Sequence, residues 1–433
     1  MIFLFVPFLA LVELFLGDSG AWWSLGGLHI RIVLFVATFI SLLLLILLDS
    51  PHKRGYWLPS DWSLGAFVIL NLLWVTIVPQ LNGVPLGQSF QDAKSLLVLV
   101  LFYPCIYLLR SHRLVWRKIK AMTGVLGVLL AFVHLVIWVA GSLFGKSNNI
   151  VAILQAIYRA PSGSAEMGIV AGGFFRVILS NSLLLLPTFF GFLSSILEQS
   201  DRRKLNTCYL VVVTAAIVVT YSRGFWITVL CGAALTIVLR ARRSGRLRRR
   251  MVLTALAMIV LAAGVWMLDV FGSHNISSAL SQNRIFTRLA SSANLLDISN
   301  KTKLEQTIRL LATWWTRPVF GLGYGSSVPG YYRSAQVFSY EVTPAALLMK
   351  IGLVGLGLWV AFMVGIVQRA RRKSATGEAG RAWYAYWLGG FVAFVLGVQS
   401  NPLLFSNVGM AILLFFIIDA MTIDRPSHSQ QLP

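Results

Sequence analysis

Apolar runs of roughly 17–25 residues recur along almost the whole chain, and each is long enough to cross a bilayer as a helix. Hydrophobic residues make up 57% of the 433 residues, and charged residues only 12%. That charged fraction is about half the value usual for a soluble domain. The mean hydropathy of +0.76 agrees with this bias. The sequence therefore predicts an integral membrane protein.

About twelve of these runs have the length of a transmembrane helix, so the expected fold is an all-α polytopic bundle formed by a single domain over residues 1–433. The N-terminal run carries no cleavage signal and is interpreted as the first span. The expected spans lie near residues 1–16, 28–48, 62–78, 95–109, 121–141, 178–197, 207–221, 224–240, 252–271, 344–368, 383–399 and 404–420.

Basic residues gather in alternate connecting segments, and the strongest case is the loop at residues 241–251. Lysine and arginine mark the cytoplasmic loops of membrane proteins, so these segments define the cytoplasmic side. With this count of spans, both termini are also cytoplasmic. The same rule accounts for the net charge of +22, so no nucleic-acid partner is predicted.

Two substantial loops then lie on the opposite side, at residues 142–177 and 272–343. The second is the longest stretch outside the expected spans, and loops of this length are usually functional. Within it, residues 303–315 have the pattern of an amphipathic helix, which Pro318 and the glycine-rich stretch 321–325 would end. We expect the chemistry of the protein in this loop.

Arg223 is the most informative charged residue on the outer side. It lies in Thr220-Tyr-Ser-Arg-Gly-Phe225, a hairpin with almost no loop between two expected spans. An ionisable group at that depth is costly and usually faces a cavity or a partner. Gly224 beside it would allow close approach of a ligand. We interpret Arg223 as functional rather than as an interface anchor.

The charged residues of the loop 272–343 allow two interpretations. Glu305 and Arg309 are four residues apart on one helix face, which is the spacing of an ordinary ion pair. Together with Arg288 and Lys303 they could instead form a cationic patch for phosphate, since arginine's planar fork suits that anion.

Glu341 lies just before the expected start of a helix at Thr343 and Pro344. A carboxylate there can complement the helix dipole, or it can serve as a general base at the membrane surface. No cluster of histidine, cysteine or acidic residues has the spacing of a metal site, so no metal or other cofactor is predicted.

The order of these features resembles the superfamily of O-antigen polymerases and O-antigen ligases of bacterial envelopes. The shared features are the Ser222-Arg-Gly224 hairpin, the basic loop, the long outer loop with Arg317-Pro-Val-Phe-Gly-Leu-Gly-Tyr-Gly325, and Met349-Lys-Ile-Gly-Leu-Val-Gly355. The resemblance extends over about residues 205–370 and more weakly upstream, where Arg176 and Asn181 match an arginine- and asparagine-containing stretch.

Two departures from the family pattern matter. Lys303 stands where members usually have an arginine, and Arg309 is the alternative for that role. Ligases of the group carry a catalytic histidine just before the next span, whereas this chain has Tyr340-Glu341 there. The second departure favours a polymerase and makes Glu341 the candidate for the base.

The resemblance implies a GT-C-like bundle in the bacterial inner membrane, multi-pass, with its active site facing the periplasm. It implies a Wzy-type polymerase that joins oligosaccharide repeat units carried on undecaprenyl pyrophosphate, which serve as both donor and acceptor. The expected transfer is inverting and metal-independent. Glu341 and Arg223 would be catalytic, and the pyrophosphate would be bound by Arg223, Lys303, Arg309, Arg288 and Arg176. Membrane lipid is an expected partner, and the resemblance leaves room for a chain-length regulator protein.

Two alternatives stay open from the sequence. One is a ligase that transfers finished polymer to lipid A–core or to another acceptor. The other is a twelve-span transporter or lipid flippase, although we find no related halves and no long central cytoplasmic loop of the kind common in transporters.

Overall fold

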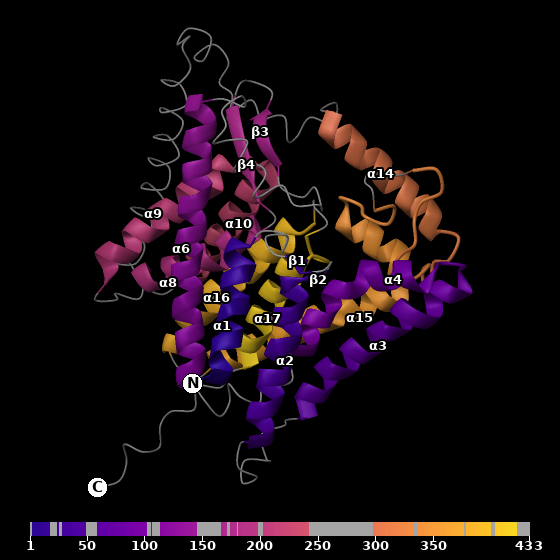
Figure 1. The fold of residues 1–433 in the computed structure, drawn as a ribbon, viewed down its shortest axis with the longest axis horizontal. Coiled ribbons are helices and arrows are strands. Elements are labelled where there is room, and N and C mark those ends of the chain that lie inside the picture. Colours follow the sequence, from indigo (N-terminus) through magenta and orange to yellow (C-terminus); the bar gives the residue numbers. More distant parts are fainter. Residues whose placement is uncertain are drawn as a thin grey trace.

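The computed structural model describes residues 2–17, 24–25, 28–48, 59–101, 105, 113–144, 166–170, 174–179, 181–197, 202–241, 298–331, 336–375, 378–399 and 403–421. This part of the chain is mostly helical, as Figure 1 shows. The expected span at 252–271 and almost all of the basic loop 241–251 lie outside it.

Each predicted span that the structure describes contains a helix. The region 95–109 differs, because its described part forms the 3-10 helix η2, which follows the short helix α4. Two short antiparallel hairpins, which the sequence did not predict, interrupt the helical pattern. The elements are α1 (Ile2–Leu16), β1 (Ser24–Leu25), β2 (Leu28–His29), α2 (Ile30–Leu48), α3 (Pro59–Leu81), α4 (Leu86–Ala93), η2 (Lys94–Leu101), α6 (Arg113–Phe144), β3 (Glu166–Val170), β4 (Phe174–Ile178), η3 (Ser182–Leu184), α8 (Leu185–Leu197), α9 (Arg203–Val219), α10 (Arg223–Ala241), α14 (Ile298–Trp314), α15 (Thr343–Ser374), α16 (Glu378–Gly397) and α17 (Asn407–Met421).

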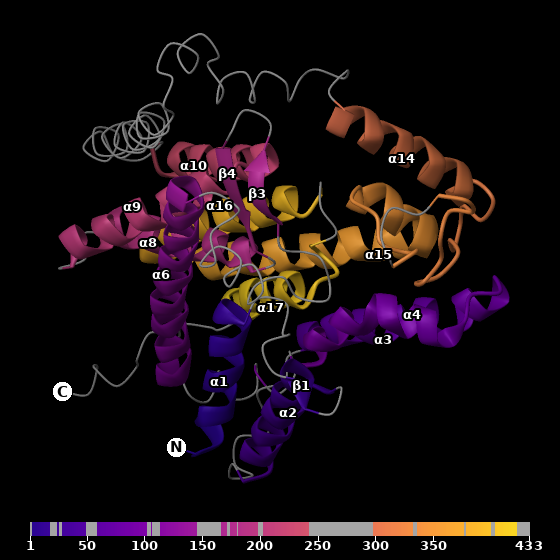
Figure 2. The same ribbon diagram turned by 45° about the horizontal axis from the view of Figure 1, so that its top comes forward.

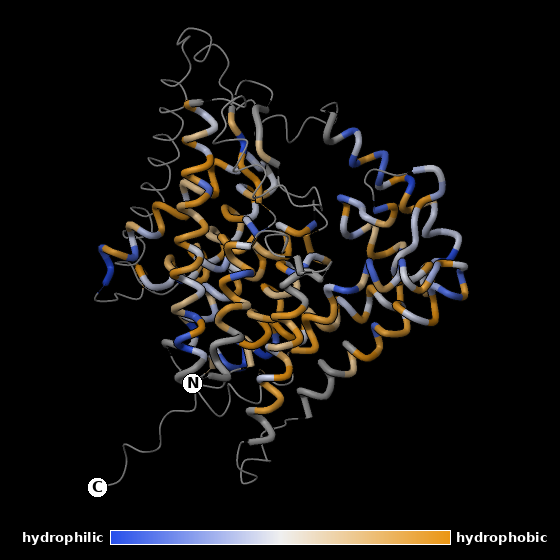
Figure 3. The backbone as a smooth tube through the Cα atoms, viewed as in Figure 1, coloured by the Kyte–Doolittle hydropathy of each residue, from blue (hydrophilic) through white to orange (hydrophobic). Residues whose placement is uncertain are grey.

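Two helical stretches, Trp116–Leu143 and Thr343–Ser374, are long and apolar enough to cross a membrane. Shorter apolar helices, among them Ile69–Leu81 and Gly224–Arg240, accompany them. Figure 3 shows the hydrophobic residues spread over most of these helices. The structure is therefore that of a helical membrane protein, while the count of twelve spans and the side of each terminus stay predictions.

The centre of the bundle is α17, in which almost every residue is buried. A helix that is apolar on all sides must be enclosed by protein or lipid, because it has no face for water. Helices α15 and η2 pack against it. From α16, the rings of Trp387 and Phe391 stack and meet Phe416 edge-on. These aromatic contacts hold α16 against α17 and fix the core.

Helices α10 and α16 pack closely against each other, and small residues make this approach possible. A Cβ at Gly232 would lie 2.4 Å from the Gly389 carbonyl oxygen, and the Thr236 hydroxyl donates to the Ala385 carbonyl oxygen at 3.3 Å. Small residues at such crossings let two helix backbones approach closely within a membrane. Toward the other end of the two helices, a Cβ added at Gly397 would lie 3.6 Å from the Thr228 hydroxyl oxygen. The two helices therefore run antiparallel.

The last turn of α17 carries Asp419, which joins four helices at one end of the bundle. Its Oδ1 accepts hydrogen bonds from Trp116 Nε1 at 2.9 Å and Lys120 Nζ at 3.3 Å, both on α6. Its Oδ2 accepts a hydrogen bond from Trp383 Nε1 of α16 at 3.0 Å. Lys373 Nζ of α15 donates to the backbone carbonyl oxygen of Asp419 at 2.9 Å. The basic segments around Lys120, Lys373 and Arg381 thus lie at the same end, in agreement with their expected placement on one side of the membrane.

The glycine-rich segment after α14 docks into a break in α15. At Gly352 the helix is interrupted by a backbone with φ of 63°. The N–H groups of Leu322 and Gly323 donate to the carbonyl oxygens of Met349 and Lys350 before the break, and that of Leu353 donates to Pro318 after it. A Cβ at Gly321 would lie 2.6 Å from Gly352 N, so both positions need glycine.

We expect Gly352→Ala to destabilise this docking. A side chain at left-handed φ costs about 1–2 kcal/mol even without a clash, and here it would also meet the backbone of Phe320 at 2.6 Å. Gly357→Ala is the matched control, because it lies in the same helix with no atom within 4 Å of the added Cβ. The midpoint of thermal unfolding in detergent should fall for the first variant and stay or rise for the second. Equal midpoints would contradict the docking.

Candidate functional site

The hairpin that carries Arg223 is as short as the sequence predicts. Helix α9 ends at Val219 and α10 begins at Arg223. Tyr221 between them is buried with φ of 46°, a value uncommon for a residue with a side chain and often found at functional sites. Trp226 closes the turn, since its indole N–H donates to the carbonyl oxygen of Ile217 at 3.0 Å. The turn is therefore held rigidly by its own residues.

Arg176 lies on β4 and contacts this hairpin. Its Nε donates to the carbonyl oxygen of Thr220 at 3.2 Å. The strand is held in place by pairing with β3, in which Gly168 faces Arg176, and by Phe175, which packs on Gly141 near the end of α6. The structure thus brings Arg176 to the hairpin in which Arg223 lies, although the sequence placed the two residues in different loops.

The start of α15 lies at the same end of the bundle as this hairpin. The Thr343 hydroxyl donates to the carbonyl oxygen of Val398 at 2.7 Å, and its N–H donates to Gln399 at 3.1 Å. These two residues directly follow α16, next to the Gly397 that contacts Thr228 of α10. Arg223 lies five residues before Thr228, about 7.5 Å along the helix. Arg223 and Glu341 therefore occupy the same end of the α10–α16 pair.

Glu341 is half-buried, and the residues on both sides of it are anchored. Tyr340 is buried and its hydroxyl oxygen accepts a hydrogen bond from Val328 N at 2.6 Å. The N–H of Val342 donates to Gln306 Oε1 at 2.9 Å, and Gln306 is fully buried on α14. Helix α15 begins at Thr343 with Pro344 in its first turn, as predicted. The position of Glu341 is thus set jointly by α14 and α15.

Helix α14 confirms the helix predicted for residues 303–315 and extends it to Ile298. Its buried face, which includes Gln306 and Leu310, rests on the start of α15, as Figures 1 and 2 both show. Lys303 lies half-buried on this helix, one turn before Thr307, whose hydroxyl donates to the Lys303 carbonyl oxygen. Lys303 and Arg309 thus lie three residues before and three residues after Gln306.

Arg309 forms the ordinary ion pair that its spacing allows. Its Nη2 lies 2.9 Å from Glu305 Oε1, and both side chains are about half exposed, at 47% and 51%. The guanidinium also lies over the ring of Tyr331, at 4.9 Å from the centroid. These contacts favour the helix-pair interpretation for Arg309. Arg288 lies outside the described residues.

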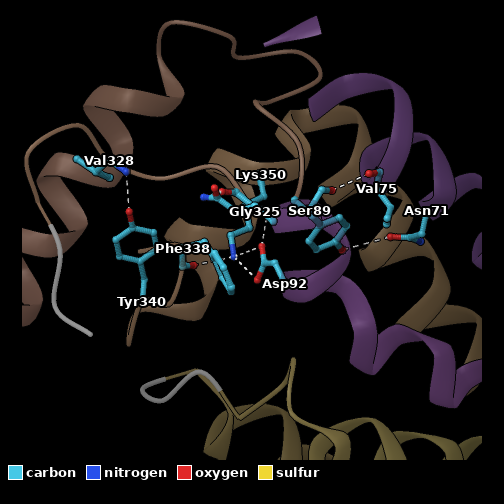
Figure 4. Close-up of polar contacts among 11 residues, drawn as sticks. Asn71, Val75, Ser89, Asp92, Gly325, Val328, Phe338, Tyr340 and Lys350 are labelled. Atoms are coloured by element: carbon cyan, nitrogen blue, oxygen red, sulfur yellow. Dashed lines mark hydrogen bonds and ion pairs between the residues drawn. The ribbon is translucent and has the colours of Figure 1, made fainter. Parts of the chain in front are cut away.

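Sequence reasoning missed a buried ion pair that holds the glycine-rich segment. Figure 4 shows Lys350 of α15 pointing toward Asp92 of α4, with Nζ 2.6 Å from Oδ2. Lys350 also donates to the carbonyl oxygen of Phe338 at 3.0 Å, and Asp92 accepts from Gly325 N at 2.7 Å. Only 5% and 7% of the two side chains are exposed. A single lysine within an apolar run was the available signal, because such a residue normally has an interior partner.

Tyr324, in the same segment, is fully buried beside this pair. Its N–H donates to the carbonyl oxygen of Trp74, and the indole N–H of Trp74 donates to Phe320 O at 2.8 Å. Burial, followed by the negative charge of Asp92, raises the pKa of the Tyr324 phenol. The phenol is therefore a neutral packing group that joins α3 to the segment.

Asn181, which matches the upstream family stretch, has a structural contact. It is fully buried, and its side-chain amide donates to the carbonyl oxygen of Phe15 on α1. The neighbouring Ser182 hydroxyl lies 2.7 Å from His134 Nε2 in the core. Asn181 and Ser182 thus link α1, α6 and the start of α8. Within the described residues no group of histidine, cysteine or acidic side chains could hold a metal ion.

The comparison with protein families finds a match to the model described as O-antigen ligase over residues 208–360. This segment runs from α9 through the hairpin, α14 and the glycine-rich segment into α15, so it contains most of the contacts described above. The match confirms the predicted resemblance for this part of the chain. No curated protein matches the chain significantly.

Breaking the Lys350–Asp92 pair should destabilise the fold strongly. Lys350→Met leaves a buried carboxylate without its counter-charge, which typically costs about 3–5 kcal/mol. The double variant Asp92→Asn/Lys350→Met should lose less, because no isolated charge remains. Thermal unfolding of the purified protein in detergent measures both.

Glu305→Gln is the control for the buried pair, since it breaks an exposed ion pair worth ~0.5 kcal/mol or less. If Lys350→Met unfolded at the same temperature as Glu305→Gln, the buried pair would not hold the segment. If the double variant were less stable than the single one, the charge argument would be wrong.

Proposed function

We propose, from the membership of residues 208–360 in the O-antigen ligase family, that this membrane protein polymerises oligosaccharide repeat units carried on undecaprenyl pyrophosphate. Members of this superfamily are membrane glycosyltransferases that use lipid-linked glycans. The finer assignment to a polymerase rests on Tyr340-Glu341, which replaces the histidine expected of a ligase. The bacterial inner membrane and a periplasmic site follow from the same proposal and from the charge of the loops.

The observation that carries the proposal is the placement of cations and one carboxylate at a single end of the bundle. Arg176 contacts the hairpin of Arg223, and α16 joins that hairpin to the start of α15, where Glu341 lies. A lipid pyrophosphate leaving group needs fixed positive charge close to the membrane surface. Such preorganised charge is usually the largest contribution to catalysis.

In the proposed reaction a sugar hydroxyl of one lipid-linked unit attacks the anomeric carbon of the other. The new glycosidic bond forms as the bond from that carbon to the pyrophosphate oxygen breaks, with inversion. Glu341 takes the hydroxyl proton. Arg223 and Arg176 stabilise the charge on the departing undecaprenyl pyrophosphate, with Lys303 supporting them from α14. The proposed transfer requires no metal. Arg288 and Arg309 are secondary candidates for binding the pyrophosphate.

A ligase remains the second candidate, because the matching family model is described by that activity. The same cations would serve a transfer of finished polymer to another acceptor. Deletion of the gene separates the two activities. Loss of a polymerase leaves glycolipid with a single repeat unit, whereas loss of a ligase leaves long chains on undecaprenyl pyrophosphate. Long chains on undecaprenyl pyrophosphate would exclude the polymerase assignment but would still agree with a glycosyl transfer.

Arg223→Ala should abolish polymer formation in a deletion strain. Removing one charge-stabilising group typically lowers a rate about 10²–10³-fold. Arg372→Ala is the control, since Arg372 is an exposed arginine at the end of α15 that the proposal does not use. Gel analysis of extracted glycolipid measures the polymer, and immunoblots of membranes measure the level of both variants. Normal polymer from Arg223→Ala at equal protein level would exclude this site.

Glu341→Gln should also abolish polymer, because the amide cannot accept the proton of the attacking hydroxyl. The size and the hydrogen bonds around Val342 stay nearly the same, so folding should be retained. Binding of the lipid-linked donor to the purified variant should persist, which separates loss of the base from loss of binding. A variant that retains polymerisation would require a different base.

A further inference from the structure

Helix α14 carries an apolar stripe that is exposed among the described residues. Leu304, Ile308, Leu311 and Trp315 follow one another at intervals of three and four residues, so they share one face. All four are exposed, with Ile308 at 59% and Trp315 at 72%. The buried face of the helix, with Gln306 and Leu310, lies on the opposite side toward α15.

The remaining face of α14 is polar and charged. Lys301 and the Glu305–Arg309 pair lie there, about a quarter-turn from the apolar stripe at 100° per residue. Exposed Arg317 follows just after the helix. Figure 3 shows this mixture of hydrophilic and hydrophobic residues along α14, in contrast to the more uniformly hydrophobic α3. A helix with one apolar and one basic face is typical of segments that lie in a membrane surface.

The stripe on α14 continues into surfaces that face lipid in the expected topology. Val319 and Phe320 follow it and are each more than half exposed. Val354 N donates to Val319 O at 3.1 Å, which places the exposed Leu353 and Val354 of α15 directly beside them. Phe320 O accepts from Trp74 of α3. The exposed apolar residues that follow α14 therefore lie directly beside those of α15.

We propose that α14 lies in the outer surface of the bilayer, with this stripe inserted among the lipid acyl chains. The occupant of the stripe is phospholipid, because the exposed apolar residues that follow it lie directly beside those of α15. Trp315 takes the position that tryptophan favours at membrane–water boundaries. The basic residues on the adjacent face meet the phosphates of the head groups. The bilayer thus supports the helix that positions Val342 and, through it, Glu341.

The test places a fluorophore on each face of α14 in the full-length protein. Cys105, Cys208 and Cys231 are first replaced by serine, and Leu311→Cys or Ala312→Cys is added and labelled with NBD. Ala312 is the matched control, since it is also exposed but lies about 100° around the helix from Leu311, on the side of Glu305. Both proteins are reconstituted into phosphatidylethanolamine–phosphatidylglycerol vesicles, with and without spin-labelled phospholipid.

We expect the label at residue 311 to emit at shorter wavelength than that at residue 312 and to be quenched several-fold more strongly by spin-labelled lipid. Emission at the long wavelength typical of water, with equally weak quenching at both positions, would overturn the proposal. So would short-wavelength emission at residue 311 without quenching by lipid, because protein would then cover the stripe. Neither result depends on glycosyl transfer, so the proposed enzymatic function is tested separately.

Discussion

The ion pair between Lys350 and Asp92 lies where charges are most costly to bury, between helices of an apolar bundle. Neither charge would be stable there alone, so α15 and α4 must meet for either to be buried. Asp92 also accepts from Gly325 N, and Lys350 donates to Phe338 O. Gly325 and Phe338, in the segment between α14 and α15, are thereby tied to α4 and α15.

The close contact between Gly321 and Gly352 lies next to this ion pair. It explains why the motif at residues 317–325 occurs together with the motif at residues 349–355. Gly321 and Gly352 approach so closely that neither tolerates a side chain, and the backbone bonds of the glycine-rich segment replace those that the break in α15 leaves open. The first motif thus completes the helix that the second interrupts. These glycines thus serve the architecture of the fold.

The bundle has two chemically different ends. One is closed by Asp419 between tryptophans and lysines of α6, α15 and α16. The other presents the hairpin of Arg223, the strand of Arg176 and the start of α15 with Glu341. The antiparallel pairing of α10 and α16 separates these ends by the length of a helix. The proposed reaction with a lipid-linked substrate would then take place at the second end only, at one face of the membrane.

The sequence alone indicated the class of protein, the positions of nearly all described helices and the family resemblance that the match over residues 208–360 confirms, because each depends on local information. Apolar length, loop charge and short motifs are read along the chain without knowing what packs against what. Only the tertiary structure decided that Lys350 is neutralised by Asp92, that Arg309 is occupied by Glu305, and that Arg176 meets the hairpin at Thr220. These outcomes depend on pairings between residues far apart in the chain, or on a choice among local partners. The energy of a buried charge or a close glycine contact arises only once both partners are brought together, and no single segment carries that information.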